Sequence, residues 1–223
     1  MGYVLSGVKN GSVPVDFIKE MQEVAPIKYF IESGTAGADS IRDAAPLFKE
    51  CHTIEIMEGT VTGGVPSNAT FYIGDSSLKL SEVLHKLDGT FAFFWLDAHY
   101  SGNEPNTSGV KECPVLDEIK AISGYKNSII LIDDARLFLG MPPWPLDPRE
   151  WPTIENVFSA LRQAFPDHYI TLMDDYVLCC HPNFRDAVNR EWRARYKLRY
   201  PDAPEKLKTQ AQDVWKAIQE YLK

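Results

Sequence analysis

Two apolar runs that stop abruptly at acidic residues constrain the fold of this chain more than any other feature. The run 91–96 is followed at once by Asp97, and the run 128–132 is followed by Asp133 and Asp134. Short, continuously apolar runs are typical of strands buried on both faces, as in parallel sheets. Because ligands of open α/β sheets bind at the carboxyl ends of the strands, these acids predict a binding site there.

The same strand ends carry an imidazole, because His99 follows Asp97 by two residues. Three carboxylates and an imidazole at one edge of a sheet would repel one another unless a cation or a proton lay among them. The pattern therefore indicates a charged site. A simpler interpretation stays open, in which the acids are ordinary helix-capping aspartates at two strand ends.

Apolar periodicity along the chain predicts strands that alternate with helices. The expected strands are 28–31, 53–56, 70–73, 91–96 and 128–132, followed by a hairpin of 169–173 and 176–180. The expected helices are 15–24, 40–48, 78–87, 115–122 and 154–165, with a final helix over 204–222. This order predicts an α/β fold, a Rossmann-like, doubly wound, seven-stranded and mostly parallel sheet with an antiparallel last strand, plus C-terminal helices. We expect one domain over residues 1–181 and a C-terminal helical extension over residues 182–223.

Composition narrows the range of partners. The chain has 223 residues and a formal net charge of -8, which argues against a nucleic-acid partner because phosphate binding needs a surplus of Lys and Arg. It contains no apolar stretch of the roughly 20 residues that a membrane span requires, and no signal-peptide pattern. We therefore expect a cytoplasmic protein without membrane partners. The four cysteines form no CxxC pair, which favours buried free thiols in a reducing compartment.

Two segments leave alternatives open. Residues 137–152 contain five prolines and two tryptophans, so they cannot form a regular helix, and the loop is either a lid over the sheet edge or a packed surface loop. The segment 185–199 holds the one basic cluster of the chain. It is either a solvated or oligomer-facing helix or a site for an anionic substrate.

A glycine-containing turn after the first strand predicts a cofactor site. Glu32 stands two residues before Gly34, and glycine permits close approach of a ligand to the backbone. The Gly-x-Gly-x-x-Gly pattern that cradles a pyrophosphate is missing, so the acid better suits a cofactor with a cationic amino group. Glu55, at the end of the second strand, is placed to accept hydrogen bonds from the hydroxyls of a ribose.

These residues resemble the class I S-adenosylmethionine-dependent methyltransferases, and more narrowly the metal-dependent sugar O-methyltransferases of the macrocin and novobiocic-acid type. The resemblance runs from about Phe30 to Cys180 and would make residues 1–181 the methyltransferase domain. It is carried by Glu32-x-Gly34, Glu55, Gly74-Asp75-Ser76, Asp97-x-His99 and Asp133-Asp134.

The resemblance implies a role for each of these positions. Residues implied to bind S-adenosyl-L-methionine are Glu32, Gly34, Thr35 and Gly37 at the first turn, Glu55 at the ribose, Asp75 and Ser76 at the adenine, and Asp97. Residues implied to hold a divalent metal, with magnesium favoured, are Asp97, Asp133 and Asp134. Asp97 and His99 are the implied catalytic residues.

The chain departs from the family at two positions. The general base is usually aspartate where His99 stands, so His99 is expected to act either as the base or as a metal ligand. Relatives commonly carry glycine where Ala38 stands, whereas this chain has Gly37 one residue earlier. A displaced glycine bears on the affinity for the cofactor.

The expected function is metal-assisted methylation of a hydroxyl on a sugar or on another small natural-product or glycan acceptor. The helix around Trp215 is a candidate surface for pairing in a homo-oligomer. One alternative is a nucleotide-sugar glycosyltransferase in which Asp97-x-His99 binds the metal, and another is a catalytically silent binding protein on a methyltransferase fold. An NAD-dependent oxidoreductase ranks lower because the phosphate-binding loop is absent.

Overall fold

The computed structural model describes residues 13–61, 63–100 and 111–199. The chain divides after residue 188 into two compact units. The helix expected over 204–222, with Trp215, lies outside the described residues. The first unit contains the sheet and every strand-end residue singled out above.

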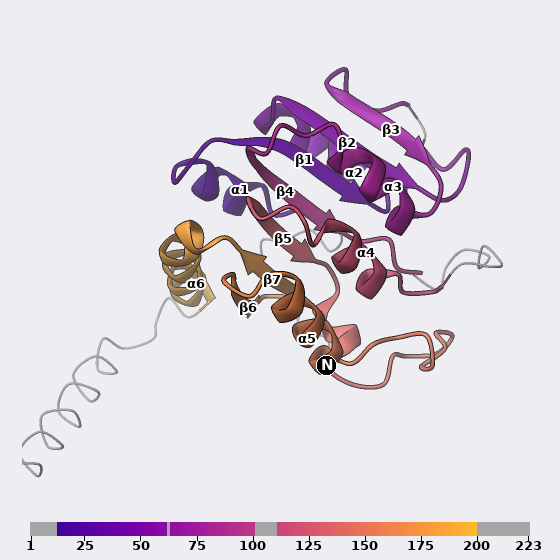
Figure 1. Cartoon of the computed structure of the whole chain (residues 1–223). Helices are drawn as coiled ribbons and strands as arrows, with labels where there is room; N and C mark the ends of the chain where they lie inside the picture. The colour runs from indigo at the N-terminus through magenta and orange to yellow at the C-terminus, as the bar shows by residue number, and fades with distance from the viewer. Residues whose placement is uncertain (1–12, 62, 101–110, 200–223) are drawn as a thin grey trace, which may run out of the picture. The chain divides into compact units, whose positions relative to one another are not determined.

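Seven strands form one sheet, in the order β3-β2-β1-β4-β5-β7-β6 (Figure 1). The strands are β1 Ile27–Ser33, β2 Glu50–Glu55, β3 Ala69–Ile73, β4 Phe91–Leu96, β5 Ser128–Ile132, β6 Tyr169–Met173 and β7 Tyr176–Cys180. Neighbouring strands are parallel except around β7, which runs antiparallel to both β5 and β6. This architecture confirms the predicted doubly wound sheet with an antiparallel last strand.

Six α-helices precede, connect or follow the strands in the described residues. They are α1 Val15–Gln22, α2 Asp39–Ala44, α3 Ser76–Leu84, α4 Val115–Ile122, α5 Ile154–Ala164 and α6 Arg185–Arg199. The helix expected to continue to Phe48 instead tightens into a 3-10 turn at Ala45–Leu47, where Pro46 has no N–H to donate to the α-helical ladder. Helix α3 begins earlier than expected because Asp75 caps it, accepting a hydrogen bond from the Ser77 N–H at 2.8 Å.

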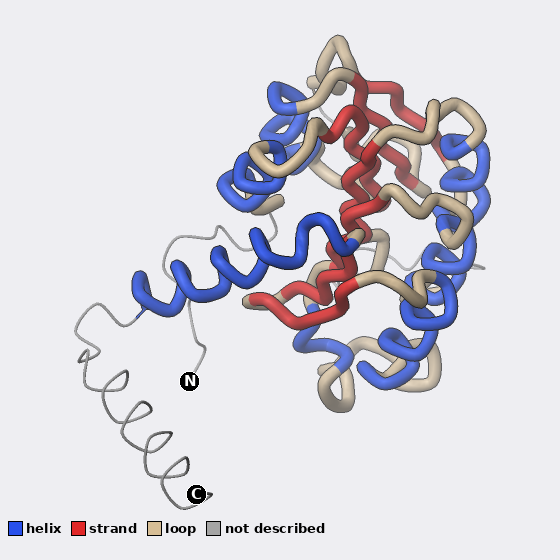
Figure 2. Tube along the Cα trace, turned by 60° about the vertical axis from the view of Figure 1, so that its left-hand side comes forward, coloured by secondary structure: helices blue, strands red, loops and turns tan. Residues whose placement is uncertain are grey.

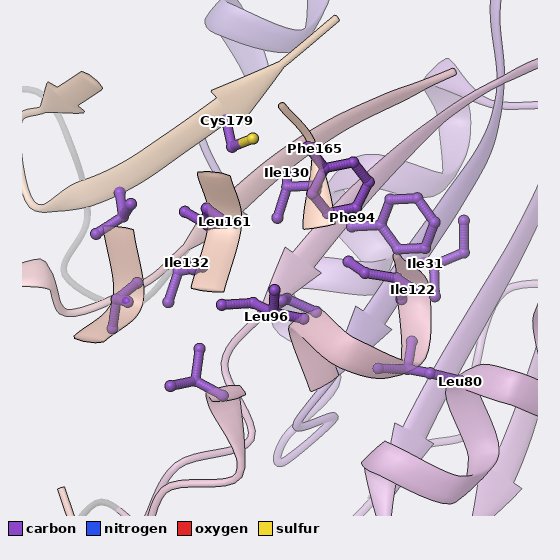
Figure 3. Packing of buried hydrophobic residues seen from close by; sticks show 14 of the residues in the cluster. Ile31, Leu80, Phe94, Leu96, Ile122, Ile130, Ile132, Leu161, Phe165 and Cys179 are labelled. Carbon is purple, nitrogen blue, oxygen red and sulfur yellow. The ribbon is translucent and has the colours of Figure 1, made fainter. Parts of the chain in front are cut away.

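Buried side chains pack on both faces of the sheet, as Figure 2 shows by the helices on either side of the strands. Phe93 and Trp95 of β4 belong to one buried cluster, while Phe94 and Leu96 belong to the other, because successive strand residues point to opposite faces. Figure 3 shows the second cluster, in which Phe94 lies beside side chains from β1 and β5. Burial on both faces explains why β4, and β5 after Ser128, are continuously apolar in sequence.

All four cysteines are buried free thiols, as the sequence indicates. No helix in the described part of the chain is both long enough and apolar enough to cross a membrane.

Candidate functional site

The site lies where the order of strands reverses, between β1 and β4. In open α/β sheets this switch point opens a crevice at the carboxyl ends of the strands. Backbone hydrogen bonds align the ends, because Asp97 N donates to Ser33 O at 3.0 Å and Asp133 N donates to Leu96 O at 3.1 Å. The residues that follow β1, β4 and β5 are therefore held side by side.

His99 lies between two carboxylates of this edge. Its Nε2 is 2.9 Å from Asp134 Oδ2, and its Nδ1 is 3.5 Å from Asp97 Oδ1. Because both ring nitrogens face acids, the arrangement favours the doubly protonated imidazolium. Arg136 supplies a second cation, with its Nη1 at 2.5 Å from Asp134 Oδ1.

The carboxylates of Asp97, Asp133 and Asp134 form the acidic cluster of the site. Their pKa values shift differently because their surroundings differ. Burial raises the pKa of Asp97, and the charges of Asp133 and Asp134 raise it further, although His99 opposes them. Burial and the neighbouring Asp134 also raise the pKa of Asp133. Burial acts in the same direction on Asp134, but His99 and Arg136 outweigh it and lower the pKa. For His99 itself, the acids overcome the effect of burial and raise the pKa.

The chemistry of the acidic cluster fits a magnesium ion, since Mg²⁺ prefers carboxylate oxygens. Asp97, Asp133 and Asp134 would hold it. In this structure, however, both oxygens of Asp134 are occupied by His99 and Arg136. Among the described residues, no group of three His, Cys, Asp or Glu side chains is arranged to hold a metal.

On the β1 side of the crevice, Glu32 is a buried acid with a buried hydrogen-bond chain. Its Oε2 accepts from Thr53 Oγ1 at 2.5 Å, and Thr53 Oγ1 lies 2.6 Å from Thr35 Oγ1. Glu32 is 1% exposed. Burial raises the pKa of Glu32 to about 8, and the charges of Asp97 and Glu55 add to the increase. A cation beside Glu32 would relieve this penalty.

The turn after Glu32 is shaped by three residues with left-handed backbone, namely Gly34, Ala36 and Ala38. Gly34 has φ +84° and packs so closely that a Cβ there would lie 2.2 Å from Asp97 O. The close approach of the ends of β1 and β4 therefore requires glycine at position 34. Ala38 has φ 66°, a left-handed conformation that favours glycine. Glycine is the residue that the family resemblance leads one to expect at this position. Gly37, by contrast, does not have a positive φ.

The two acids at the ends of β2 and β3 already have backbone partners. Glu55 accepts hydrogen bonds from the N–H groups of Ala36, Ile56 and Met57 at 2.8–3.1 Å. A carboxylate offers about four lone-pair sites, so one remains for a ligand hydroxyl. Asp75 accepts at one oxygen from Ser77 N and Oγ, so its Oδ1 serves as the cap of α3.

The end of the proline-rich loop 137–152 forms one wall of the site. The Trp151 ring lies edge-on to His99 with centroids 5.5 Å apart. Its Nε1 donates to Glu112 Oε2 at 3.0 Å, and Asp147 N donates to the same oxygen at 2.8 Å. The large apolar side chains in the middle of the loop are exposed, namely Leu139, Met141 and Trp144.

The structure thus brings Asp97, His99, Asp133 and Asp134 together, and places Glu32, Gly34 and Thr35 across the switch point from them. Sequence reasoning missed Thr53, Arg136 and Glu118. Glu118 had a detectable signal, because it is an acid within the apolar stripe of its helix. Arg136 had none, because its pairing with Asp134 depends on the turn after β5.

Comparison with known proteins bears on the fold. No family model and no curated protein sequence matches the chain. A protein of Klebsiella pneumoniae provisionally named as an O-methyltransferase superposes with a TM-score of 0.54 at 18% identity, covering 78% of this chain and 84% of that one. The O-methyltransferase from Bacillus cereus, in complex with S-adenosylhomocysteine (SAH), gives 0.52 at 15% identity, with coverage of 77% and 82%. The chain therefore has a Rossmann-like methyltransferase fold.

Proposed function

We propose that this protein is an S-adenosylmethionine-dependent methyltransferase that methylates a hydroxyl of a sugar or another small natural-product or glycan acceptor. The observation that carries the proposal is the juxtaposition across the switch point of the Glu32 turn and the cluster around His99. One side offers a buried acid for a cationic cofactor. The other offers an imidazole held by a carboxylate, which is a common arrangement for proton transfer.

The cofactor would extend along the ends of β1, β2 and β3. Glu32 would face the cationic methionine end, Glu55 would accept a ribose hydroxyl at its remaining site, and Asp75 with Ser76 would border the adenine. The fit is supported by two buried polar atoms at this edge, Ser33 Oγ and Glu118 Oε1, which have no hydrogen-bond partner in the described residues. Buried polar groups normally have partners, so a ligand would complete them.

The acceptor would lie over β4 and β5, where Trp151 excludes water beside His99. His99 would take the proton of the acceptor hydroxyl in its neutral form, which is favoured once a bound cation neutralises the neighbouring carboxylates, and Asp134 would hold the orientation of the ring. Methyl transfer depends mainly on alignment of the acceptor with the sulfonium methyl. A magnesium ion at the acidic cluster would lower the pKa of a bound hydroxyl.

Asp133 offers a way to separate turnover from cofactor binding. With Asp133→Asn, we expect methyl transfer from labelled S-adenosylmethionine to fall by on the order of 100-fold, since the acidic cluster loses a charge beside the reacting oxygen. SAH affinity, measured by calorimetry, should stay nearly unchanged because Asp133 lies on the acceptor side. Catechol and methyl glycosides serve as acceptors that present vicinal hydroxyls. The control is Glu20→Gln, an exposed acid of α1, and equal loss of binding and turnover would contradict this division of roles.

Magnesium should act through the same acidic cluster. We expect MgCl₂ to raise the melting temperature of the wild type, because a cation relieves the repulsion among the three carboxylates. Asp133→Asn should abolish the increase, whereas Glu20→Gln should keep it. An identical response in all three proteins would show that the cluster does not bind the ion.

The glycosyltransferase alternative is favoured by one feature, the Asp97-x-His99 pair at a strand end. It predicts that a nucleoside diphosphate with Mg²⁺ stabilises the protein more than SAH does. The methyltransferase proposal predicts the reverse in the same thermal-shift experiment. SAH binding without turnover on any acceptor would instead favour a silent binding protein.

A further inference from the structure

Glu118 is a buried acid that the fold does not need and the proposed reaction does not use. It lies on α4 in a stripe with Val115, Ile119 and Ile122, all of which are buried. Helical spacing therefore calls for an apolar residue at position 118. Glu118 is instead 1% exposed, and its Oε1 has no hydrogen-bond partner among the residues that the structure describes. A buried, unpartnered carboxyl oxygen destabilises the free protein, and a bound ligand that donates a hydrogen bond to it would relieve this cost.

The surroundings of Glu118 place it at the edge of the sheet. The hydroxyls of Ser76, which begins α3, and of Ser33, which ends β1, both act on its carboxyl. Ser33 Oγ is itself buried and without a partner in the described chain. Burial raises the pKa of Glu118, and the two hydroxyls offset this effect only in part. Asp75 and His99 are the charged groups that act on it, in opposite directions.

One unsatisfied acceptor, Glu118 Oε1, therefore lies near Ser76 and Asp75, where the proposed cofactor would place its adenine. A buried acceptor needs a donor from the ligand. The donors of an adenosine are its exocyclic amine and its ribose hydroxyls. Glu55 has a free site for a hydroxyl at the end of β2. The amine is then the donor that remains for the buried carboxyl oxygen of Glu118 near α3.

We propose that Glu118 is a further cofactor-binding residue, which accepts a hydrogen bond from the exocyclic amine of adenine and so selects adenine over other purines. The inference rests on the proposed function, because it requires an adenosine cofactor at this edge. It adds a specificity-determining residue on α4, an element to which the sequence motifs assign no role.

The test compares two ligands that differ at one group. SAH carries the amine, whereas S-inosylhomocysteine carries a carbonyl oxygen in its place. We expect the wild type to prefer SAH in calorimetry, and Glu118→Gln to reduce that preference at least about tenfold, because the amide can donate to the carbonyl. The preference is a ratio of two affinities, so a general loss of folded protein does not change it.

A second variant separates ligand binding from structure. Glu118→Leu completes the apolar stripe of α4 and should raise the melting temperature of the free protein while removing the preference for adenine. Asp117→Asn is the matched control, since it removes the adjacent, partly exposed acid of the same helix turn. It should leave the preference unchanged.

The outcomes are distinguishable. A lowered preference in both Glu118 variants and not in Asp117→Asn supports the inference. Equal weakening of both ligands in the Glu118 variants would make Glu118 a structural residue and overturn it. Binding of neither ligand by the wild type would overturn the proposed function as well, so the two failures have different signatures.

Discussion

Gly34→Ala should abolish the native arrangement of the site, with a loss of more than about 3 kcal/mol in the free energy of unfolding. A Cβ at position 34 would lie 2.2 Å from Asp97 O and 2.6 Å from Asp97 C. These are backbone atoms held by the sheet, so the ends of β1 and β4 would have to separate. The left-handed φ of +84° adds about 1–2 kcal/mol of strain for any residue with a Cβ. Urea denaturation measures the loss, and SAH binding should disappear with it.

Two other glycines separate the effect of positive φ from the effect of the close approach of the strands. Gly59 has φ +81°, and no atom lies within 4 Å of the position that an added Cβ would take, so Gly59→Ala reports the strain of positive φ alone. Gly37 has no positive φ, and a Cβ there would lie 3.9 Å from its nearest neighbour, Asp39 Oδ2. Gly37→Ala should therefore change stability little. If Gly34→Ala proved no less stable than Gly59→Ala, the close approach of the two strand ends would be wrong.

Glu32→Gln should change how stability and cofactor binding depend on pH. The pKa of Glu32 is raised from 4.5 to about 8 in the folded protein, mainly by burial. Between these values the folded protein holds a proton that the unfolded chain has released, so wild-type stability falls as pH rises through this window. A glutamine side chain does not titrate. The variant should therefore gain stability relative to the wild type from pH 5 to pH 8, by at most about 5 kcal/mol.

The same substitution should weaken binding of SAH, because the glutamine amide offers no negative charge to a cationic amino group. In the wild type, binding should strengthen as pH rises toward 8, since the ligand cation favours the ionised form of Glu32. The variant should lose this dependence. Urea denaturation and calorimetry across the pH range measure both effects, with Glu20→Gln as the exposed control. Parallel pH profiles for the two variants would contradict a buried, titrating Glu32.

Much of the fold follows from local patterns in the sequence. Apolar runs such as Phe91–Leu96 predict buried parallel strands because both faces of each strand must be apolar. Helical spacing in segments such as Ile154–Ala164 predicts which helix face packs on the sheet. Boundaries were less predictable, as at Pro46 and Asp75, because a cap or a missing N–H shifts a helix end by a few residues.

The candidate site, like the fold, could be predicted from the sequence only in part. Sequence by itself determined that acids stand at the ends of β1, β2, β4 and β5, because a strand end is visible wherever an apolar run meets a polar residue. It did not determine their partners. His99 pairs with Asp134 across 35 positions of chain, and Asp134 also pairs with Arg136.

Only the tertiary structure decided those contacts, because they depend on geometry between elements that are far apart in the sequence. Periodicity encodes which face of an element is buried, which is a local property. The distance from Gly34 to Asp97, or the lack of a partner for Glu118 Oε1 among the described residues, depends on the register between strands and on how helices pack across them. Such long-range geometry is set by all the contacts of the core together, so it emerges only when the chain is folded.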